Sequence, residues 1–327
     1  MKVPNMRPLF MLLQFGLALL LSLGQAAFAQ KFPERPITLL VPYAAGGPAD
    51  QHMRALVEDA GRALGQTVVI QNVPGASGTN GALALTRAAA DGYTLALLPS
   101  TLYREPHMTT VKYDPLSSFA YIILMSDYTQ GLAVRADSPW ANWKDFVADA
   151  AKRPGRLNIG VNGIIGTPRI VMEEAAEGSG VQLNMVPFKG DSEIAAALLG
   201  GHIDAAPLSG IASPHIVAGK MRYLVVLTEK RVKRYPDTPT LRETGTDVWM
   251  SSPYGIGAPA GTDPVKLKLL HDAFHKALDG AASLKTMEQL NQLMVYKNQD
   301  DYRAFVVDTF AKEKIRVGKL RQRGLLE

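Results

Sequence analysis

Residues 37–50 read ITLLVPYAAGGPAD, and this order of residue types decides the fold. The apolar run 37–41 predicts a buried strand, because Val, Ile and Leu in succession suit a strand covered on both faces. The turn around Gly46 and Gly47 follows, and Pro48 suits a first helical turn, where its missing N–H would have no partner. A strand, a glycine-rich turn and a helix in succession indicate an α/β lobe with a largely parallel sheet.

The same unit recurs in the second half of the chain. Residues 157–161 predict a buried strand, and the turn from Asn162 to Gly166 leads into a helix that begins near Thr167 and Pro168. The pattern predicts further strands at 67–70, 94–98, 131–134, 182–186, 205–206 and 222–227. It predicts helices at about 78–89, from 142, and at 191–199, 264–278 and 300–323, and it changes from residue 254 onward.

Two such series indicate two lobes, and no linker rich in Gly, Ser or Pro separates them. We therefore expect crossing strands instead of a tether. The first lobe is expected to contain residues 30–130 and 254–327, and the second lobe residues 131–253. A hinge is expected near 129–132 and 252–256.

Residues 1–29 have the three parts of a secretory signal peptide. Lys2 and Arg7 precede an apolar run, and the A-x-A cleavage motif of Ala27, Phe28 and Ala29 follows it. An uncleaved membrane anchor is the weaker alternative, because the run is short for the ~20 residues of a spanning helix. The sequence contains no cysteine, which excludes a lipoprotein anchor and disulfides. We expect a diffusible exported protein whose fold depends on core burial.

The charge of the chain gives no sign of a nucleic-acid partner. The net charge is +5, and the basic residues are dispersed. The basic cluster 230–234 is interpreted as a solvated turn, although contact with a membrane partner is an alternative.

The two glycine-rich turns are candidate anion sites, because each directs unpaired N–H groups and the positive end of a helix dipole at one point. If the lobes face each other, the turns meet across a cleft that fits a small carboxylate. Neither turn has the spacing of a nucleotide-binding loop, and each alone is equally consistent with a tight connection.

Three side chains near these turns have two interpretations each. Tyr43 either lines the cleft or belongs to the core. Asp50 either accepts a hydrogen bond from a ligand or stabilises the start of its helix. Lys189 either attracts an anion or is simply exposed.

Patterns typical of enzymes are weak in this sequence. No G-x-S-x-G motif occurs. His271 and His275 have an i, i+4 spacing, but neither the adjacent Glu of a zinc motif nor a third ligand accompanies them. We therefore expect no catalytic residue, no metal and no cofactor.

Seven ordered blocks resemble the receptors of tripartite tricarboxylate transporters, also called the Bug family, over essentially the whole mature chain. They are FPERPI with VPYAAGGPAD (32–37 and 41–50), NVPGASG (72–78), ADGYTL (90–95), VPFKG (186–190), ALLGGHID (197–204), YPDTPT (235–240) and GIGAPAG (255–261).

The resemblance implies a periplasmic-binding-protein-like fold of type II, with two α/β lobes joined by crossing strands and a ligand cleft between them. It also implies a periplasmic, monomeric solute receptor that binds a small organic carboxylate and delivers it to membrane transporter subunits, without catalysis. The implied ligand-binding residues are Tyr43, Ala44, Gly46, Gly47, Asp50, Ser100, Thr101, Asn162, Gly163, Gly166, Thr167, Lys189, Gly190 and Asp191.

Two stretches depart from the family pattern close to the expected cleft. Residues 167–170 lack a His that the family often carries there, and residues 99–104 lack a small polar run with Asn. Arg104 and Arg169 either supply charge for a second carboxylate or are exposed, and exposure is the preferred interpretation. The identity of the acid stays open. Two other functions are weaker alternatives: a receptor that signals to a sensor protein, and an exported enzyme acting on a small acid.

Overall fold

The computed structural model describes residues 32–326. Residues from Arg35 onward form one compact unit. The predicted signal peptide lies outside the described residues. Within the described part, no helix is both long enough and apolar enough to cross a membrane.

The first lobe is built on a sheet whose described strands run in the order β11-β4-β10-β3-β1-β2. β1 (Ile37–Val41) pairs in parallel with β2 (Val68–Asn72) and β3 (Thr94–Pro99), whereas β10 (Pro253–Pro259) is antiparallel to β3 and β4 (Phe119–Asp127). β11 (Leu293–Lys297) forms an edge and pairs with β4.

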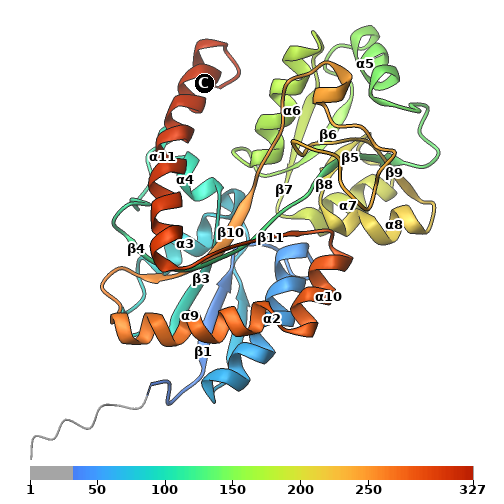
Figure 1. Ribbon diagram of the computed structural model, residues 1–327. Helices are drawn as coiled ribbons and strands as arrows, with labels where there is room; N and C mark the ends of the chain where they lie inside the picture. Colours follow the sequence, from blue (N-terminus) through green and yellow to red (C-terminus); the bar gives the residue numbers. More distant parts are fainter. Residues whose placement is uncertain (1–31, 327) are drawn as a thin grey trace, which may run out of the picture. The chain divides into compact units, whose positions relative to one another are not determined.

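Helices cover both faces of this sheet (Figure 1). α2 (Pro48–Leu64), α9 (Pro264–Leu278) and α10 (Ala281–Gln289) pack together on one face. α3 (Asn80–Leu85), α4 (Thr101–Met108) and α11 (Gln299–Gln322) lie on the other, where α11 contacts both α4 and β4. Their apolar side chains form a core around Leu98, Leu102, Tyr121 and Tyr302.

The second lobe contains the strand order β8-β5-β9 and the parallel pair β6-β7. A bridge from Ile159 to Ala205 joins these two groups. The strands are β5 (Gly131–Arg135), β6 (Asn158–Asn162), β7 (Asn184–Phe188), β8 (Ala206–Leu208) and β9 (Met221–Val226). The helices are α5 (Trp143–Lys152), α6 (Thr167–Gly178), α7 (Asp191–Leu199) and α8 (Ser213–Val217).

Most expected elements are confirmed, and α7 and α9 have the predicted bounds. The helix expected at about 78–89 is shorter: α3 covers Asn80–Leu85 and follows a single 3₁₀ turn, Ala76–Gly78. The sequence analysis missed β4, α4, α8, α10 and β11. β4 is a nearly continuous apolar run, whose period does not distinguish a strand from a buried helix, and β11 is an edge strand with two exposed apolar residues, Leu293 and Met294.

The chain passes between the sheets twice. It leaves the first sheet after β4, enters the second at β5, and returns as it enters β10. The expected hinge residues fall at these two crossings. The hinge and the lobe boundaries stay predictions.

Candidate ligand-binding cleft

The two glycine-rich turns lie on opposite sides of one small cavity of about 40 Å³. The first turn connects β1 to α2, and the second connects β6 to α6. The cavity is lined by Tyr43, Ala44, Gly47, Pro48, Ala49, Ser77, Ser100, Thr101, Tyr128, Gln130, Asn162, Gly166, Thr167, Pro168, Gly190, Asp191 and Ser252.

The first turns of four helices meet at this cavity. Gly47 precedes α2, Ser100 precedes α4, Gly166 precedes α6 and Gly190 precedes α7, and all four residues line it. The N–H groups of a first helical turn have no partner within the helix, and the helix dipole is positive there. No lysine or arginine is among the described lining residues. The lining therefore presents helix N-termini and hydroxyl groups, which are donor groups of the kind that suit an anion.

Glycine is required at both turns for local reasons. Gly46 has φ +77°, in the left-handed region that favours glycine. At Gly166, an added Cβ would collide with the carbonyl oxygen of Asn162. These residues let a strand reverse into a helix within a short connection.

The two lobes touch each other around the cavity. The N–H of Ile165 donates to Oγ of Ser77 across the lobes (3.1 Å), and within the first lobe the Thr101 hydroxyl holds Ser77 by donating to its carbonyl (3.0 Å). A Cβ at Gly163 would collide with Ser77. Oγ of Ser100 lies 3.3 Å from Oγ1 of Thr167. The structure is therefore a closed form of the cleft.

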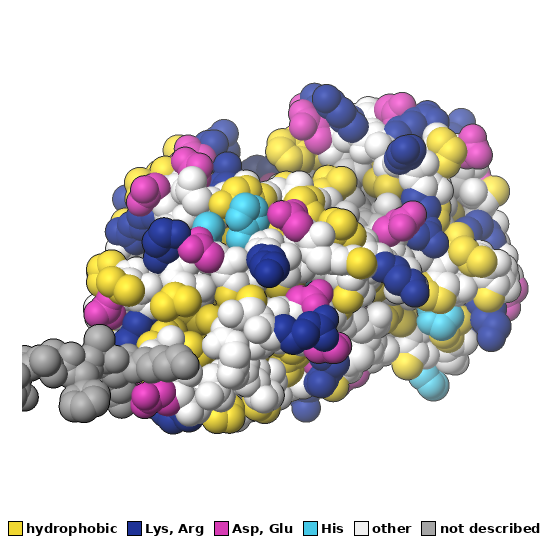
Figure 2. All heavy atoms as spheres, turned by 60° about the horizontal axis from the view of Figure 1, so that its bottom comes forward, with side chains coloured by type: hydrophobic (Ala, Val, Ile, Leu, Met, Phe, Trp, Pro, Cys, Tyr) yellow, Lys and Arg dark blue, Asp and Glu magenta, His cyan; other side chains and the backbone are white. Residues whose placement is uncertain are grey.

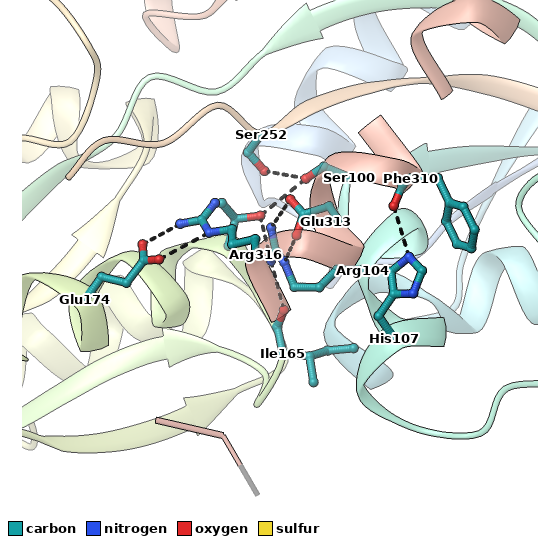
Figure 3. Close-up of polar contacts among 10 residues, drawn as sticks. Ser100, Arg104, His107, Ile165, Glu174, Ser252, Phe310, Glu313 and Arg316 are labelled. Carbon is teal, nitrogen blue, oxygen red and sulfur yellow. Dashed lines mark hydrogen bonds and ion pairs between the residues drawn. The ribbon is translucent and has the colours of Figure 1, made fainter. Parts of the chain in front are cut away.

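Arg104 corrects the sequence analysis, which preferred an exposed arginine. It is 1% exposed, because its guanidinium enters the contact between the lobes (Figure 3). Nε and Nη2 bind the carboxylate of Glu313 at 2.6 and 2.9 Å, and Nη1 donates to the Ile165 carbonyl and to Thr167 Oγ1, both at 3.2 Å. Arg104 lies behind Thr167 and not in the cavity lining. Arg169 binds Glu173 and the Ile164 carbonyl and does not line the cavity either.

The structure brings ten of the residues implied by the resemblance to the cavity and leaves four away from its lining. The four are Gly46, Asp50, Gly163 and Lys189. Lys189 is exposed. Gly163 faces a neighbouring groove that Lys189 also lines.

The side chain of Asp50 bonds groups around the start of its own helix, α2, and does not line the cavity. It is 2% exposed, and its carboxylate accepts hydrogen bonds from Arg54 (2.8 and 3.0 Å), the Gly46 N–H (2.9 Å) and Asn72 (2.9 Å). Burial raises its pKa, but these hydrogen bonds outweigh burial and leave the pKa below its usual value. In this closed form Asp50 shapes the turn that faces the cavity.

Sequence reasoning missed seven lining residues: Pro48, Ala49, Ser77, Tyr128, Gln130, Pro168 and Ser252. Three of them adjoin residues that were named, so a wider window around each turn would have found them. Ser77 had a usable signal, because it lies between Gly75 and Gly78 in a hydroxyl-bearing turn. Tyr128, Gln130 and Ser252 come from the crossing segments and carry no local signal.

Tyr43, which is half-buried, and Asp191, which is buried, are polar groups at the cavity. Burial raises the pKa of Tyr43, and the nearby Asp191 carboxylate raises it further. Burial also raises the pKa of Asp191, and hydrogen bonds from Ser209 offset part of this effect. Tyr43 therefore lines the cleft as a neutral hydroxyl.

The other charged and metal-like features do not converge on a site in the described residues. Lysine, arginine and acidic side chains are intermixed over the face shown in Figure 2. Arg231 of the basic cluster pairs with Glu243. His271 and His275 lie beside Tyr296, and no group of three or more potential ligands suited to a metal ion occurs between residues 32 and 326. The expected absence of nucleic-acid binding stays a prediction.

The fold and the cleft define a class, the two-lobe solute-binding proteins of the periplasmic-binding-protein type. Within this class the chain belongs to the tripartite tricarboxylate transporter family receptors, whose family pattern matches residues 52–321. The resemblance to the Bug family is thereby confirmed.

Known relatives span nearly the whole chain. The UPF0065 protein in the gbd 5′ region of Cupriavidus necator is 40% identical to this chain. The match spans 91% of this chain and 93% of the relative's length. The periplasmic binding protein BugD, whose structure is solved, is 29% identical in sequence and matches with a TM-score of 0.85. The match spans 90% of this chain and 99% of the BugD chain. MatC from Rhodopseudomonas palustris, solved with bound malate, is 26% identical in sequence and matches with a TM-score of 0.82. The match spans 88% of this chain and 100% of the MatC chain.

Proposed function

We propose that this receptor binds a small organic carboxylate between its lobes. The observation that carries the proposal is the meeting of four helix N-termini at one cavity without a lysine or arginine in its lining. Such a site binds an anion through N–H and O–H donors. The malate bound to MatC supports this ligand class.

The arrangement suits capture by closure. An acid first meets the turn after β1 or the turn after β6, and rotation about the crossing segments then brings the other turn against it. Closure excludes water, which strengthens the hydrogen bonds to the carboxylate. Contacts such as Ile165 N–H to Ser77 form only when the lobes meet, so the bound state is distinct in shape from the open state.

We further propose that the receptor works in the periplasm as a monomer and presents its closed form to membrane subunits of a tripartite transporter. The family to which the chain belongs supports this role. The cavity contributes binding groups in this proposal. The hydroxyls of Ser77, Ser100 and Thr167 are engaged with Ile165, Ser252, Arg104 or one another, and no histidine is among the described lining residues to act as a base.

A thermal-shift screen tests the ligand class. The panel contains mono-, di- and tricarboxylates, acidic amino acids and aromatic acids, together with the amides of the same acids. A ligand that binds the folded state alone raises the melting temperature. We expect a shift with at least one acid, none with its amide, and no turnover of the acid. Absence of a shift with every acid contradicts the carboxylate proposal, and turnover contradicts the receptor role.

Thr167→Val tests the position of the site. It removes a lining hydroxyl at nearly constant volume, and we expect the shift with the best acid to shrink. Thr286→Val is the matched control, because Thr286 lies in α10 and its hydroxyl bonds the Ala282 carbonyl away from the cavity. Equal shifts in the two variants would remove Thr167 from the site.

A further inference from the structure

Asp191 places an acidic side chain in a cavity that otherwise suits anions. It is the first residue of α7, 8% exposed, and lines the cavity. Its Oδ2 accepts a hydrogen bond from the Ser209 hydroxyl at 2.8 Å. A carboxylate in the wall of a carboxylate site repels the ligand unless something lies between the two charges.

No cation of the described chain neutralises Asp191. Ser209 hydrogen-bonds its carboxylate through both its hydroxyl and its backbone, and no lysine or arginine is among the causes of its pKa shift. The titratable groups near it are the hydroxyls of Tyr43, Tyr128 and Tyr223, which stay neutral because burial raises their pKa values. The α7 dipole offsets part of the charge. Asp50 contrasts with Asp191, since Arg54, Asn72 and a backbone N–H saturate it.

Gln130 adds a second buried acceptor to the same cavity. It comes from the crossing segment, is 6% exposed, and its Oε1 has no hydrogen-bond partner among the described residues. A buried amide oxygen without a donor costs free energy until a donor arrives, and a buried carboxylate without a cation gains from each further donor. The four helix N-termini and the hydroxyls supply donors, so the cavity combines a donor-rich part with two acceptors.

We propose that Asp191 accepts a hydrogen bond from a donor group on the ligand, so that the receptor selects acids bearing a hydroxyl or ammonium group over unsubstituted acids of the same length. This rests on the proposed binding of carboxylates. The ligand carboxylate lies at the helix N-termini, and its hydroxyl or ammonium group lies between that carboxylate and Asp191. A donor there replaces a repulsion by a charge-assisted hydrogen bond.

The test uses matched acids that differ at C2 alone. Isothermal titration compares propionate, lactate and alanine; succinate, malate and aspartate; and glutarate, 2-hydroxyglutarate and glutamate. Within the length that binds, we expect the hydroxy or amino acid to bind about tenfold to hundredfold more tightly than the unsubstituted acid. The hydroxyl and ammonium arms identify which donor the site prefers.

Asp191→Asn tests the residue. It keeps the size of the side chain and removes its charge, and we expect the preference for the substituted acid to fall at least about tenfold. Glu193→Gln is the matched control, because it removes an acid from the same helix at an exposed position outside the cavity. We expect this variant to keep the preference.

A measurement on the unaltered protein keeps the test decisive if Asp191→Asn does not fold. Titrations in two buffers of different ionisation enthalpy count the protons taken up on binding. Because the proposal requires an ionised Asp191 in the complex, we expect no uptake with the substituted acid at neutral pH, and release of a proton at a pH low enough to protonate the free carboxyl. Uptake of one proton shows a protonated Asp191 that donates to the acid, and overturns the inference.

The outcomes separate the two proposals. Equal binding of substituted and unsubstituted acids, unchanged in Asp191→Asn, overturns the role of Asp191 and leaves the carboxylate receptor intact. Failure of every acid in both the titrations and the thermal screen overturns the proposed function itself.

Discussion

His52 shows how one buried residue couples the fold of the first lobe to pH. It is 0% exposed in α2, with Nδ1 2.6 Å from the Tyr254 hydroxyl and Nε2 3.1 Å from Oγ of Ser283. These contacts join α2, β10 and α10 behind the cleft. Burial lowers the pKa of His52 to about 4 from 6.5.

We expect the free energy of unfolding to fall as the pH decreases from about 6.5 to about 4. In this window the unfolded chain binds a proton at residue 52 and the folded chain does not, so acid favours unfolding by up to about 3 kcal/mol. Urea unfolding at pH 7 and pH 4.5 measures the loss. In His52→Gln the free energy of unfolding should depend less on pH than in the unaltered protein. In the control His202→Gln, where the histidine is exposed, the pH dependence should be unchanged. Identical pH profiles for both variants would contradict the assignment.

Gly166 tests the second turn at the same scale. We expect Gly166→Val to abolish acid binding, because its Cβ collides with the Asn162 carbonyl and displaces the start of α6. Gly318→Val introduces the same residue into α11, where an added Cβ meets nothing within 4 Å. Titration measures binding, and thermal unfolding without acid confirms that each variant is folded. Unchanged binding by folded Gly166→Val would remove this turn from the site.

At the scale of elements, α11 of the first lobe holds α6 of the second through ion pairs. Arg316 binds Glu174 at 2.6 Å, and Arg323 pairs with Glu177 (Figure 3 shows the first pair). Arg104 and Glu313 form a buried pair next to them. These contacts involve no cavity-lining residue except Thr167, so they favour closure whether or not an acid is bound.

We expect the double variant Glu174→Gln, Glu177→Gln to open the lobes in the absence of acid. Each partly exposed pair contributes about 1 kcal/mol or less, so the closed population falls several-fold. Spin labels at Lys112→Cys and Lys144→Cys report the distance between the lobes, without background because the chain contains no cysteine. Glu58→Gln, which breaks an exposed pair within α2, is the control. A distance distribution identical to that of the unaltered protein would show that the pairs do not influence closure.

At the scale of the molecule, the lobes meet by close backbone packing as well as by ion pairs. Gly210 of the second lobe lies directly against the backbone of Leu290 at the end of α10. Asp127 accepts a hydrogen bond from the Ser252 N–H at 2.6 Å and so ties the two crossing segments together. Closure therefore depends on surfaces far from the cavity.

Gly210→Val tests this dependence. We expect its side chain to separate the lobes and weaken acid binding about tenfold or more, although residue 210 does not line the cavity. Small-angle scattering with saturating acid should give a larger radius of gyration than that of the unaltered protein. Gly318→Val again serves as the control. Full affinity together with a compact radius in Gly210→Val would contradict a coupling between this contact and the cleft.

The sequence by itself determined the alternation of strands and helices, the two glycine-rich turns and the family. These features are local, because burial, turn geometry and helix starts depend on residues a few positions apart. It also predicted most of the cavity lining near the turns. Tertiary structure alone decided that Tyr128, Gln130 and Ser252 join the lining, that Asp50 is saturated by its neighbours, and that Arg104 is buried between the lobes. Those outcomes depend on contacts between segments far apart in the chain, such as Arg104 with Glu313. No periodic pattern or motif in the sequence indicates that these two residues pair.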